Sequence, residues 1–147
     1  MSYNAKNKIT ISKEVKDLFE SENKNVSIGS KLHALNESEE KFLIELMEYT
    51  EKIWSDSTVS ASDYHNNLGL SKSKLYRTIM AVIGTSPNRF LNNYRLNKAL
   101  DKLKKKDSNI SEVAYSSGFS SPSYFSKSFL KTYGILPSEY VKNILKD

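Results

Sequence analysis

Two stretches of the chain carry the same order of apolar, glycine and proline positions. In each, a turn with glycine precedes apolar residues four positions apart, and a second glycine and a proline follow. Apolar residues at this interval predict a helix with one buried face, while glycine ends a helix and proline begins the next. The stretches therefore predict two helix-turn-helix units. They run Leu68-Gly69-Leu70-Ser71-x3-Leu75-x3-Ile79-x4-Gly84-x2-Pro87 and Ser117-Gly118-Phe119-Ser120-x4-Phe125-x3-Phe129-x4-Gly134-x2-Pro137.

Polar residues at helix starts set the bounds of the predicted helices. A capping residue followed three positions later by an acidic residue opens a helix, and this spacing occurs at Asn36, Ser60 and Asn109. Ser71 and Ser86 can cap two further helices, the second with proline at its first position. The predicted helices span about 37–55, 60–67, 72–83, 86–106, 109–115 and 121–133, with a last one from 137.

The helix from 86 to about 106 is long enough to hold two reading elements apart. About 20 residues at 1.5 Å per residue span roughly 30 Å, and major-groove faces on one side of B-DNA recur roughly every 34 Å. The alternating stretch Lys8–Ile11 is too short to build a sheet alone. We therefore predict an all-α fold, with two helix-turn-helix subdomains joined by a long connecting helix.

Composition narrows the class of protein. Hydrophobic residues make up 38% of the 147 residues, and no stretch approaches the roughly 18 apolar residues of a membrane span. The start of the chain lacks the apolar region of a signal peptide, so we expect a cytoplasmic protein without membrane contact. The absence of cysteine excludes disulfides and thiolate metal sites.

The positive charge lies with the two predicted units. Residues 1–57 hold 8 Lys/Arg against 11 Asp/Glu, a balance of −3, while residues 58–147 hold 14 against 6, a balance of +8. Basic side chains next to phosphates release condensed counterions, so a segment this basic favours a polyanionic partner. A merely solvated basic surface is the alternative interpretation of the charge.

A longer set of residues around the second unit resembles the signature of the AraC/XylS family of transcription regulators. The set runs Ser111-Glu112-Val113-Ala114-Tyr115-x2-Gly118-Phe119-Ser120-x-Pro122-Ser123-Tyr124-Phe125-Ser126-Lys127-x-Phe129-x3-Tyr133-Gly134-x2-Pro137-Ser138-Glu139-Tyr140. The first unit fits the first half of the same domain through Gly69-Leu70-Ser71-x-Ser73-x-Leu75-Tyr76-Arg77, Gly84-x-Ser86-Pro87 and Arg95-Leu96-x2-Ala99. Tyr64 and His65 depart from the pattern, because the family has smaller residues there.

The resemblance covers about residues 37–147 and implies a function. It implies sequence-specific binding of double-stranded DNA as a transcription regulator, with RNA polymerase as a candidate second partner. Residues 1–35 are then expected to form a linker or tail that is partly disordered. Residues 36–147 are expected to form an AraC-type double helix-turn-helix DNA-binding domain, with recognition helices at about 72–83 and 122–133 in successive major grooves.

The residues Leu35-Asn36-Glu37-Ser38-Glu39-Glu40-Lys41-Phe42-Leu43 are similar to the start of the carboxy-terminal module of hybrid two-component regulators. In such proteins a sensor kinase, a receiver and an AraC-type domain share one chain. On this interpretation, residues 1–35 are the tail of a longer sensor-regulator chain. A free-standing regulator that begins at Met1 is the alternative, and both remain open at this point.

The residues expected to touch DNA lie on the outward faces of the two recognition helices, because a recognition helix places its amino-terminal half in the major groove. The resemblance assigns base contact to Ser73 and Arg77 in the first unit and to Ser123 and Lys127 in the second. An arginine at position 77 can pair with guanine O6 and N7. The full expected set is Ser71, Lys72, Ser73, Lys74, Tyr76, Arg77, Ser121, Ser123, Tyr124, Lys127 and Lys131.

Short hydroxyl side chains discriminate bases less sharply than arginine does. We therefore expect the second unit to add affinity and orientation, while the first sets more of the sequence preference. Arg95 on the connecting helix matches a family arginine, and we favour a structural role for it, such as pairing with a core carboxylate, over phosphate contact.

Two other classes of protein compete with this interpretation. An enzyme would need a catalytic constellation, but His33 and His65 have no paired acid or nucleophile at a motif spacing, so we expect no catalysis, metal or cofactor. A helical protein-interaction module or adaptor without specific DNA binding is the second alternative. Such a module does not need the +8 segment or two units in register.

Overall fold

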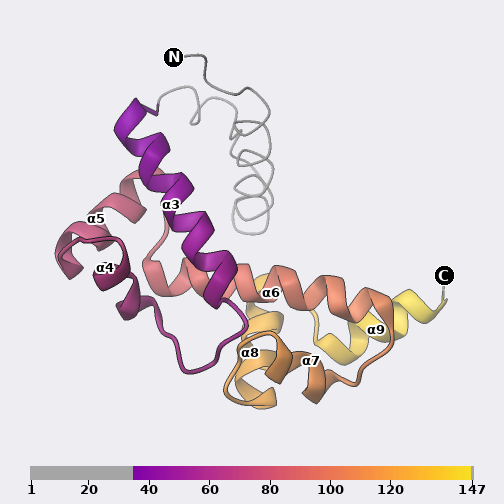
Figure 1. Ribbon diagram of the computed structural model, residues 1–147. Coiled ribbons are helices and arrows are strands. Elements are labelled where there is room, and N and C mark those ends of the chain that lie inside the picture. The colour runs from indigo at the N-terminus through magenta and orange to yellow at the C-terminus, as the bar shows by residue number, and fades with distance from the viewer. Residues whose placement is uncertain (1–34, 147) are drawn as a thin grey trace.

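The structure is a computed structural model, and it describes residues 35–146. All regular elements in this range are helical, as the sequence predicted, and Figure 1 shows their arrangement. Among them, no helix has both the length and the apolar character needed to cross a bilayer. In chain order, the elements are α3 (Glu37–Ile53), a 3₁₀ turn η1 (Ala61–Asp63), α4 (Tyr64–Asn67), α5 (Lys72–Val82), α6 (Pro87–Lys105), α7 (Ile110–Ser116), α8 (Pro122–Tyr133) and α9 (Pro137–Lys146).

The predicted capping residues begin the helices in which they were expected. Asn36 and Asn109 each accept a hydrogen bond from the backbone N–H three residues on, and the cap N–H donates to the glutamate carboxylate at that position. The start at Ser60 differs from the prediction of one short helix, because η1 precedes α4. The helices end within about two residues of their predicted bounds. The strand-like Lys8–Ile11 lies outside the described residues.

Two separate hydrophobic cores lie along α6, the long helix that runs through the middle of Figure 1. Phe90, Leu91 and Tyr94 on its first half pack with residues of α3, α4 and α5. Leu96 and Leu103 on its second half pack with α7 and α8, and α9 adds partly buried residues. The 19 residues of α6 span about 28 Å. One rigid element therefore carries both helix-turn-helix units, α4–α5 and α7–α8.

Arg95 lies at the point where α6 passes from one core to the other. Its Nε donates a hydrogen bond to the carbonyl of Trp54 at 2.7 Å. Its Nη2 donates to the carbonyls of Asp56 at 2.8 Å and Val59 at 2.9 Å. Burial lowers the pKa of this guanidinium. The expected structural role is confirmed, although the partners are backbone carbonyls of the α3–η1 loop and not the carboxylate that we expected.

The same loop also meets the second unit, at Gly118 in the α7–α8 turn. A Cβ on this glycine would lie 2.2 Å from the Trp54 carbonyl oxygen and 2.6 Å from Arg95 Nε, so no side chain fits. The Trp54 ring lies under Lys98 Nζ at 5.5 Å and Lys102 Nζ at 5.1 Å from its centroid. The end of α3 thus joins the first unit to the second.

Candidate nucleic-acid interface

The helix α5 follows the tight turn of the first unit and has one buried face and one exposed face. Ser71 caps it, and the Ser71 hydroxyl accepts a hydrogen bond from the Lys74 N–H at 3.1 Å. Leu75 and Ile79 are buried in the first core, at the four-residue interval that the sequence showed. The side chains between them must therefore face away from α6.

The residues predicted to touch DNA in the first unit all lie on the exposed surface of α5 or at its cap. Tyr76 keeps 51% of its surface exposed, which is high for a large aromatic side chain. The hydroxyl of Thr78 turns back to the Lys74 carbonyl at 2.7 Å, so it does not extend from this face. The predicted residues Ser71, Lys72, Ser73, Lys74, Tyr76 and Arg77 are all exposed.

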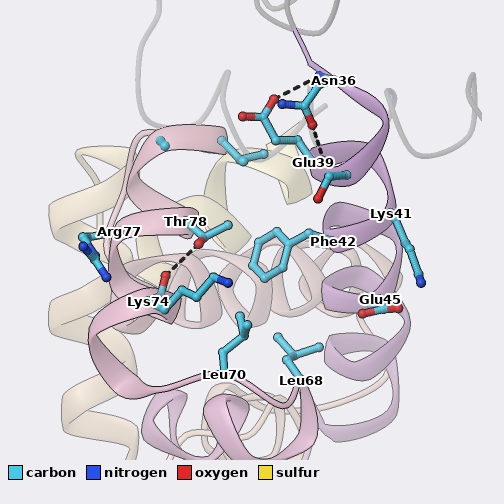
Figure 2. Close-up of a pocket in the computed structure, with 13 residues that line it drawn as sticks. Asn36, Glu39, Lys41, Phe42, Glu45, Leu68, Leu70, Lys74, Arg77 and Thr78 are labelled. Atoms are coloured by element: carbon cyan, nitrogen blue, oxygen red, sulfur yellow. Dashed lines mark hydrogen bonds between the residues drawn. The ribbon is translucent and has the colours of Figure 1, made fainter.

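A groove of about 850 Å³ separates α5 from the amino-terminal half of α3. Figure 2 shows Phe42 reaching into it from α3, above Leu68 and Leu70 of the α4–α5 turn. Lys74 and Arg77 line the groove from α5, and Arg77 keeps an exposed side chain. The helix α3 therefore packs beside α5 without covering Arg77.

The helix α8 repeats this arrangement in the second unit. Ser121 caps it by accepting a hydrogen bond from the Tyr124 N–H at 3.1 Å, and Pro122 occupies the first helical position. Phe125 and Phe129 are fully buried, with ring centroids 5.7 Å apart. These rings fix α8 on the second core, and the opposite face of α8 is left for solvent or a ligand.

The outward residues of α8 differ in how firmly they are held. Tyr124 is 52% exposed, yet its ring packs on buried Phe119 with centroids 5.9 Å apart. Ser123, Lys127 and Lys131 are exposed, while Ser121 is half-buried at the cap. The structure thus brings the predicted residues of the second unit together on one helix and its cap, with only Ser121 less accessible.

A second hollow, about 480 Å³ in volume, lies between the first turns of α6 and the outward side of α8. We call it the α6–α8 cleft. Its lining residues are Ser86, Asn88, Arg89, Asn92, Asn93, Tyr124, Lys127, Ser128, Lys131 and Thr132. The sequence did not single out Arg89 as a residue of this site, because it is one of many cations in a basic segment. The cleft exists only once α6 and α8 have packed together.

No metal-binding group is found among residues 35–146, since no three His, Cys, Asp or Glu side chains gather closely enough to hold an ion. His65, in α4, is half-buried, and His33 lies outside the described residues. What the described site offers is a set of cations, hydroxyls and one exposed aromatic ring on each recognition helix. These groups are suited to binding an extended anion.

A family model described as a helix-turn-helix domain matches residues 64–143, which include both units and α6. The chain belongs to the AraC/XylS family. Its described residues form an all-helical domain of the type seen in AraC-type regulators. The resemblance seen in the sequence is thereby confirmed.

Relatives of this chain include proteins of different overall size. The chain is 39% identical over 77 residues to histidine kinase P4 of Formosa agariphila, and the matched segment covers 52% of this chain and 6% of that protein. It is 38% identical over 73 residues to the transcriptional regulator MtrA of Neisseria gonorrhoeae, covering 50% of this chain and 24% of MtrA. The chain therefore spans only a small part of the length of these relatives.

Solved structures show the same arrangement of helices. The carboxy-terminal domain of AraT, a response regulator from Geobacillus stearothermophilus, superposes with a TM-score of 0.65 at 27% identity, covering 74% of this chain and 87% of that one. The carboxy-terminal domain of the two-component response regulator YesN from Fusobacterium nucleatum gives a TM-score of 0.64 at 25% identity, covering 72% and 99%.

Proposed function

We propose that this regulator binds duplex DNA sequence-specifically by placing α5 and α8 in two successive major-groove segments on one face of the duplex. The observation that carries the proposal is the attachment of both recognition helices to the single helix α6. The length of α6, about 28 Å, is close to the roughly 34 Å between such groove segments. The predicted contact residues of both helices are exposed, apart from the half-buried cap residue Ser121.

The two recognition helices are proposed to read DNA unequally. Arg77, exposed on α5, has the fork of donors that pairs with guanine, and Ser73 lies one turn before it. On α8 the reading positions hold Ser123 and Lys127. Hydroxyls and a flexible ammonium discriminate bases less sharply, so α5 sets more of the sequence preference and α8 adds affinity and orientation.

The setting of the domain within a cell is also a proposal. Similarity to a segment of a histidine kinase and to domains of two response regulators supports a role as the output module of a sensor-regulator system. In that role the proposed location is the cytoplasm, and RNA polymerase is a second candidate partner. Residues 36–147 are proposed as the DNA-binding domain and residues 1–35 as a linker.

A helical protein-interaction module is the competing proposal, and the groove between α3 and α5 is the observation that favours it. Duplex DNA separates the two functions, because phosphate contacts release counterions and make the affinity for DNA steeply dependent on salt. Affinity for duplex DNA, measured by fluorescence anisotropy between about 50 and 200 mM salt, is expected to fall steeply. No measurable duplex binding at the lower salt concentration would contradict the proposed function.

A further inference from the structure

The carboxy-terminal end of α3 is attached to both helix-turn-helix units. Residues of α3 pack in the first core, and the helix ends at Ile53 beside the middle of α6 (Figure 1). The Trp54 carbonyl that follows accepts the hydrogen bond from Arg95 Nε and lies against Gly118 in the turn of the second unit. One residue at the end of α3 therefore contacts α6 and the second unit at the same time.

The side chain of Trp54 makes a separate attachment. Its indole lies under two ammonium groups of α6, with Lys98 Nζ at 5.5 Å and Lys102 Nζ at 5.1 Å from the ring centroid. Lys102 Nζ also donates a hydrogen bond at 2.8 Å to the carbonyl of Ser116, the last residue of α7. The Lys102 ammonium group thus links the end of α3 to the end of α7.

The carboxylate of Glu51 holds the same end of α3 on α6. It lies 3.1 Å from Lys98 Nζ and accepts a hydrogen bond from the Tyr94 hydroxyl. Lys98 therefore contacts both an acid and an aromatic ring of the α3 end. We call this set of contacts the Trp54 junction, and its residues are Glu51, Trp54, Tyr94, Arg95, Lys98, Lys102, Ser116 and Gly118.

The junction restrains motions that the two cores leave open. Among the described residues the cores share no member, so each unit is held on its own half of α6. Packed helices can slide over one another by small amounts, and a long helix can bend. A unit that moved against the other would have to break the hydrogen bonds of Arg95 and Lys102 and separate Trp54 from Gly118. The junction therefore opposes sliding and rotation between the two units.

We propose that the Trp54 junction sets the spacing between DNA boxes that the protein accepts, with Trp54 and Lys102 as positioning residues that act through the placement of α8. This inference rests on the proposed function, because spacing matters only if α5 and α8 bind one duplex. Moving one box by a single base pair shifts it by about 3.4 Å along the duplex and turns it by about 35°. Two units that are locked together cannot follow that movement, whereas units that slide can.

Duplexes with altered spacing test the junction. Three duplexes carry the two boxes that the wild-type protein selects, at the selected spacing and with one base pair removed or added between them. Trp54→Leu removes the ring, Trp54→Phe keeps an aromatic face, and Lys102→Met keeps the apolar stem without the ammonium group. Lys105→Met removes the same charge from the exposed last residue of α6 and is the matched control.

The wild type is expected to lose roughly tenfold in affinity on either altered duplex, which is about the effect of one mismatched base pair. Trp54→Leu and Lys102→Met should lose less than about threefold, because α8 can then follow the displaced box and keep its contacts. Trp54→Phe and Lys105→Met should keep the wild-type ratio. A general loss of stability would lower the affinity for all three duplexes alike, so the ratio reports the placement of the units and not the fold.

A distance measurement without DNA gives an independent readout. The chain has no cysteine, so Met80→Cys on α5 and Leu130→Cys on α8, both at exposed positions, place spin labels on the two recognition helices alone. Double electron–electron resonance should give a narrow distance distribution for the labelled wild type and for Lys105→Met. Trp54→Leu and Lys102→Met should give a broader one.

Two results would overturn the proposal. One is a spacing preference in Trp54→Leu and Lys102→Met equal to that of the wild type, whatever the distances show. The other is a distance distribution as narrow in these variants as in the wild type. A wild-type protein that binds a single box as tightly as both boxes would instead contradict the proposed function, and the distances would show separately whether the junction holds the two units together.

Discussion

Arg77 is the side chain on which the proposed sequence preference depends most. Its exposure on α5, at the groove between α3 and α5, leaves its guanidinium accessible to a base edge. We expect Arg77→Ala to weaken binding to the preferred duplex by about 1–3 kcal/mol and to relax one base position. Lys142→Ala, which removes an exposed cation from α9, is the control. Both proteins are titrated against single-base variants of the duplex. If Arg77→Ala has the same affinity and the same base preference as the wild type, this role is ruled out.

Tyr64 is a residue whose size departs from the family pattern, and it is 1% exposed. The Thr50 hydroxyl lies 2.6 Å from the Leu46 carbonyl, to which it donates, and 2.7 Å from the Tyr64 hydroxyl. Tyr64→Phe leaves a buried oxygen of Thr50 with one partner fewer, so we expect a loss of about 1 kcal/mol in the free energy of unfolding. Tyr115→Phe, at an exposed tyrosine, should cost almost nothing in the same urea titration. Equal losses would contradict this account.

The exposure of single residues was predictable where local periodicity determines it. Lys74, Tyr76 and Arg77 were expected to lie outside the core because Leu75 and Ile79 must face inward, and all three are exposed. The partner of Tyr64 was not predictable in this way. Thr50 is 14 residues away on a different helix, and no spacing rule relates the two.

At the scale of elements, the turn at Gly118 is the most constrained part of the fold. Its φ of +85° disfavours any side chain, and a Cβ would meet the Trp54 carbonyl. Gly69 and Gly134 also have positive φ, but a Cβ added at either would have no atom within 4 Å. They therefore serve as controls for the backbone strain alone. Alanine at the controls should cost about 1–2 kcal/mol from backbone strain alone.

Gly118→Ala should cost about 2–5 kcal/mol, because the clash with Trp54 and Arg95 adds to the same strain. Urea denaturation of the three variants gives the comparison. If Gly118→Ala were no less stable than Gly69→Ala, the close approach between the α3–η1 loop and the second unit would not exist in solution.

The start of η1 makes stability depend on pH through Asp63. The Ser60 N–H donates to the Asp63 carboxylate at 2.8 Å, and this backbone hydrogen bond lowers the pKa of the carboxyl below its ordinary 3.8. The fold stabilises the ionised form, so this contribution is complete above about pH 5 and is lost as pH falls through the lowered pKa. The stability difference between the wild type and Asp63→Asn should therefore shrink from pH 6 to pH 3 in thermal unfolding. A constant difference would exclude this linkage.

Helix bounds were predictable because the signals that set them are local. Asn36, Asn109 and the serines before α5 and α6 act within three residues of themselves. Contacts between elements were not predictable from such signals. The meeting of Trp54 with Gly118, and the cleft that Arg89 borders, join positions at least 35 residues apart in the sequence. They depend on how α3 and α8 pack on α6, which single-sequence patterns do not specify.

At the scale of the whole molecule, the two cores along α6 fix the positions of α5 and α8 relative to each other. Each core is small, yet both include residues of the same helix, so the positions of α5 and α8 are linked through one rigid element. Arg95 and Gly118 add contacts where the two units meet. The charge of +8 on residues 58–147 draws this pair toward a polyanion.

The central claim is that α5 and α8 read one duplex together, and selection from a random duplex pool tests it most directly. The wild-type protein is mixed with the pool at moderate salt, and the retained duplexes are sequenced over several rounds. We predict two short conserved boxes whose centres lie about one helical turn, or 10–11 base pairs, apart. Enrichment of a single box, of two boxes at variable spacing, or of no sequence at all would contradict the claim.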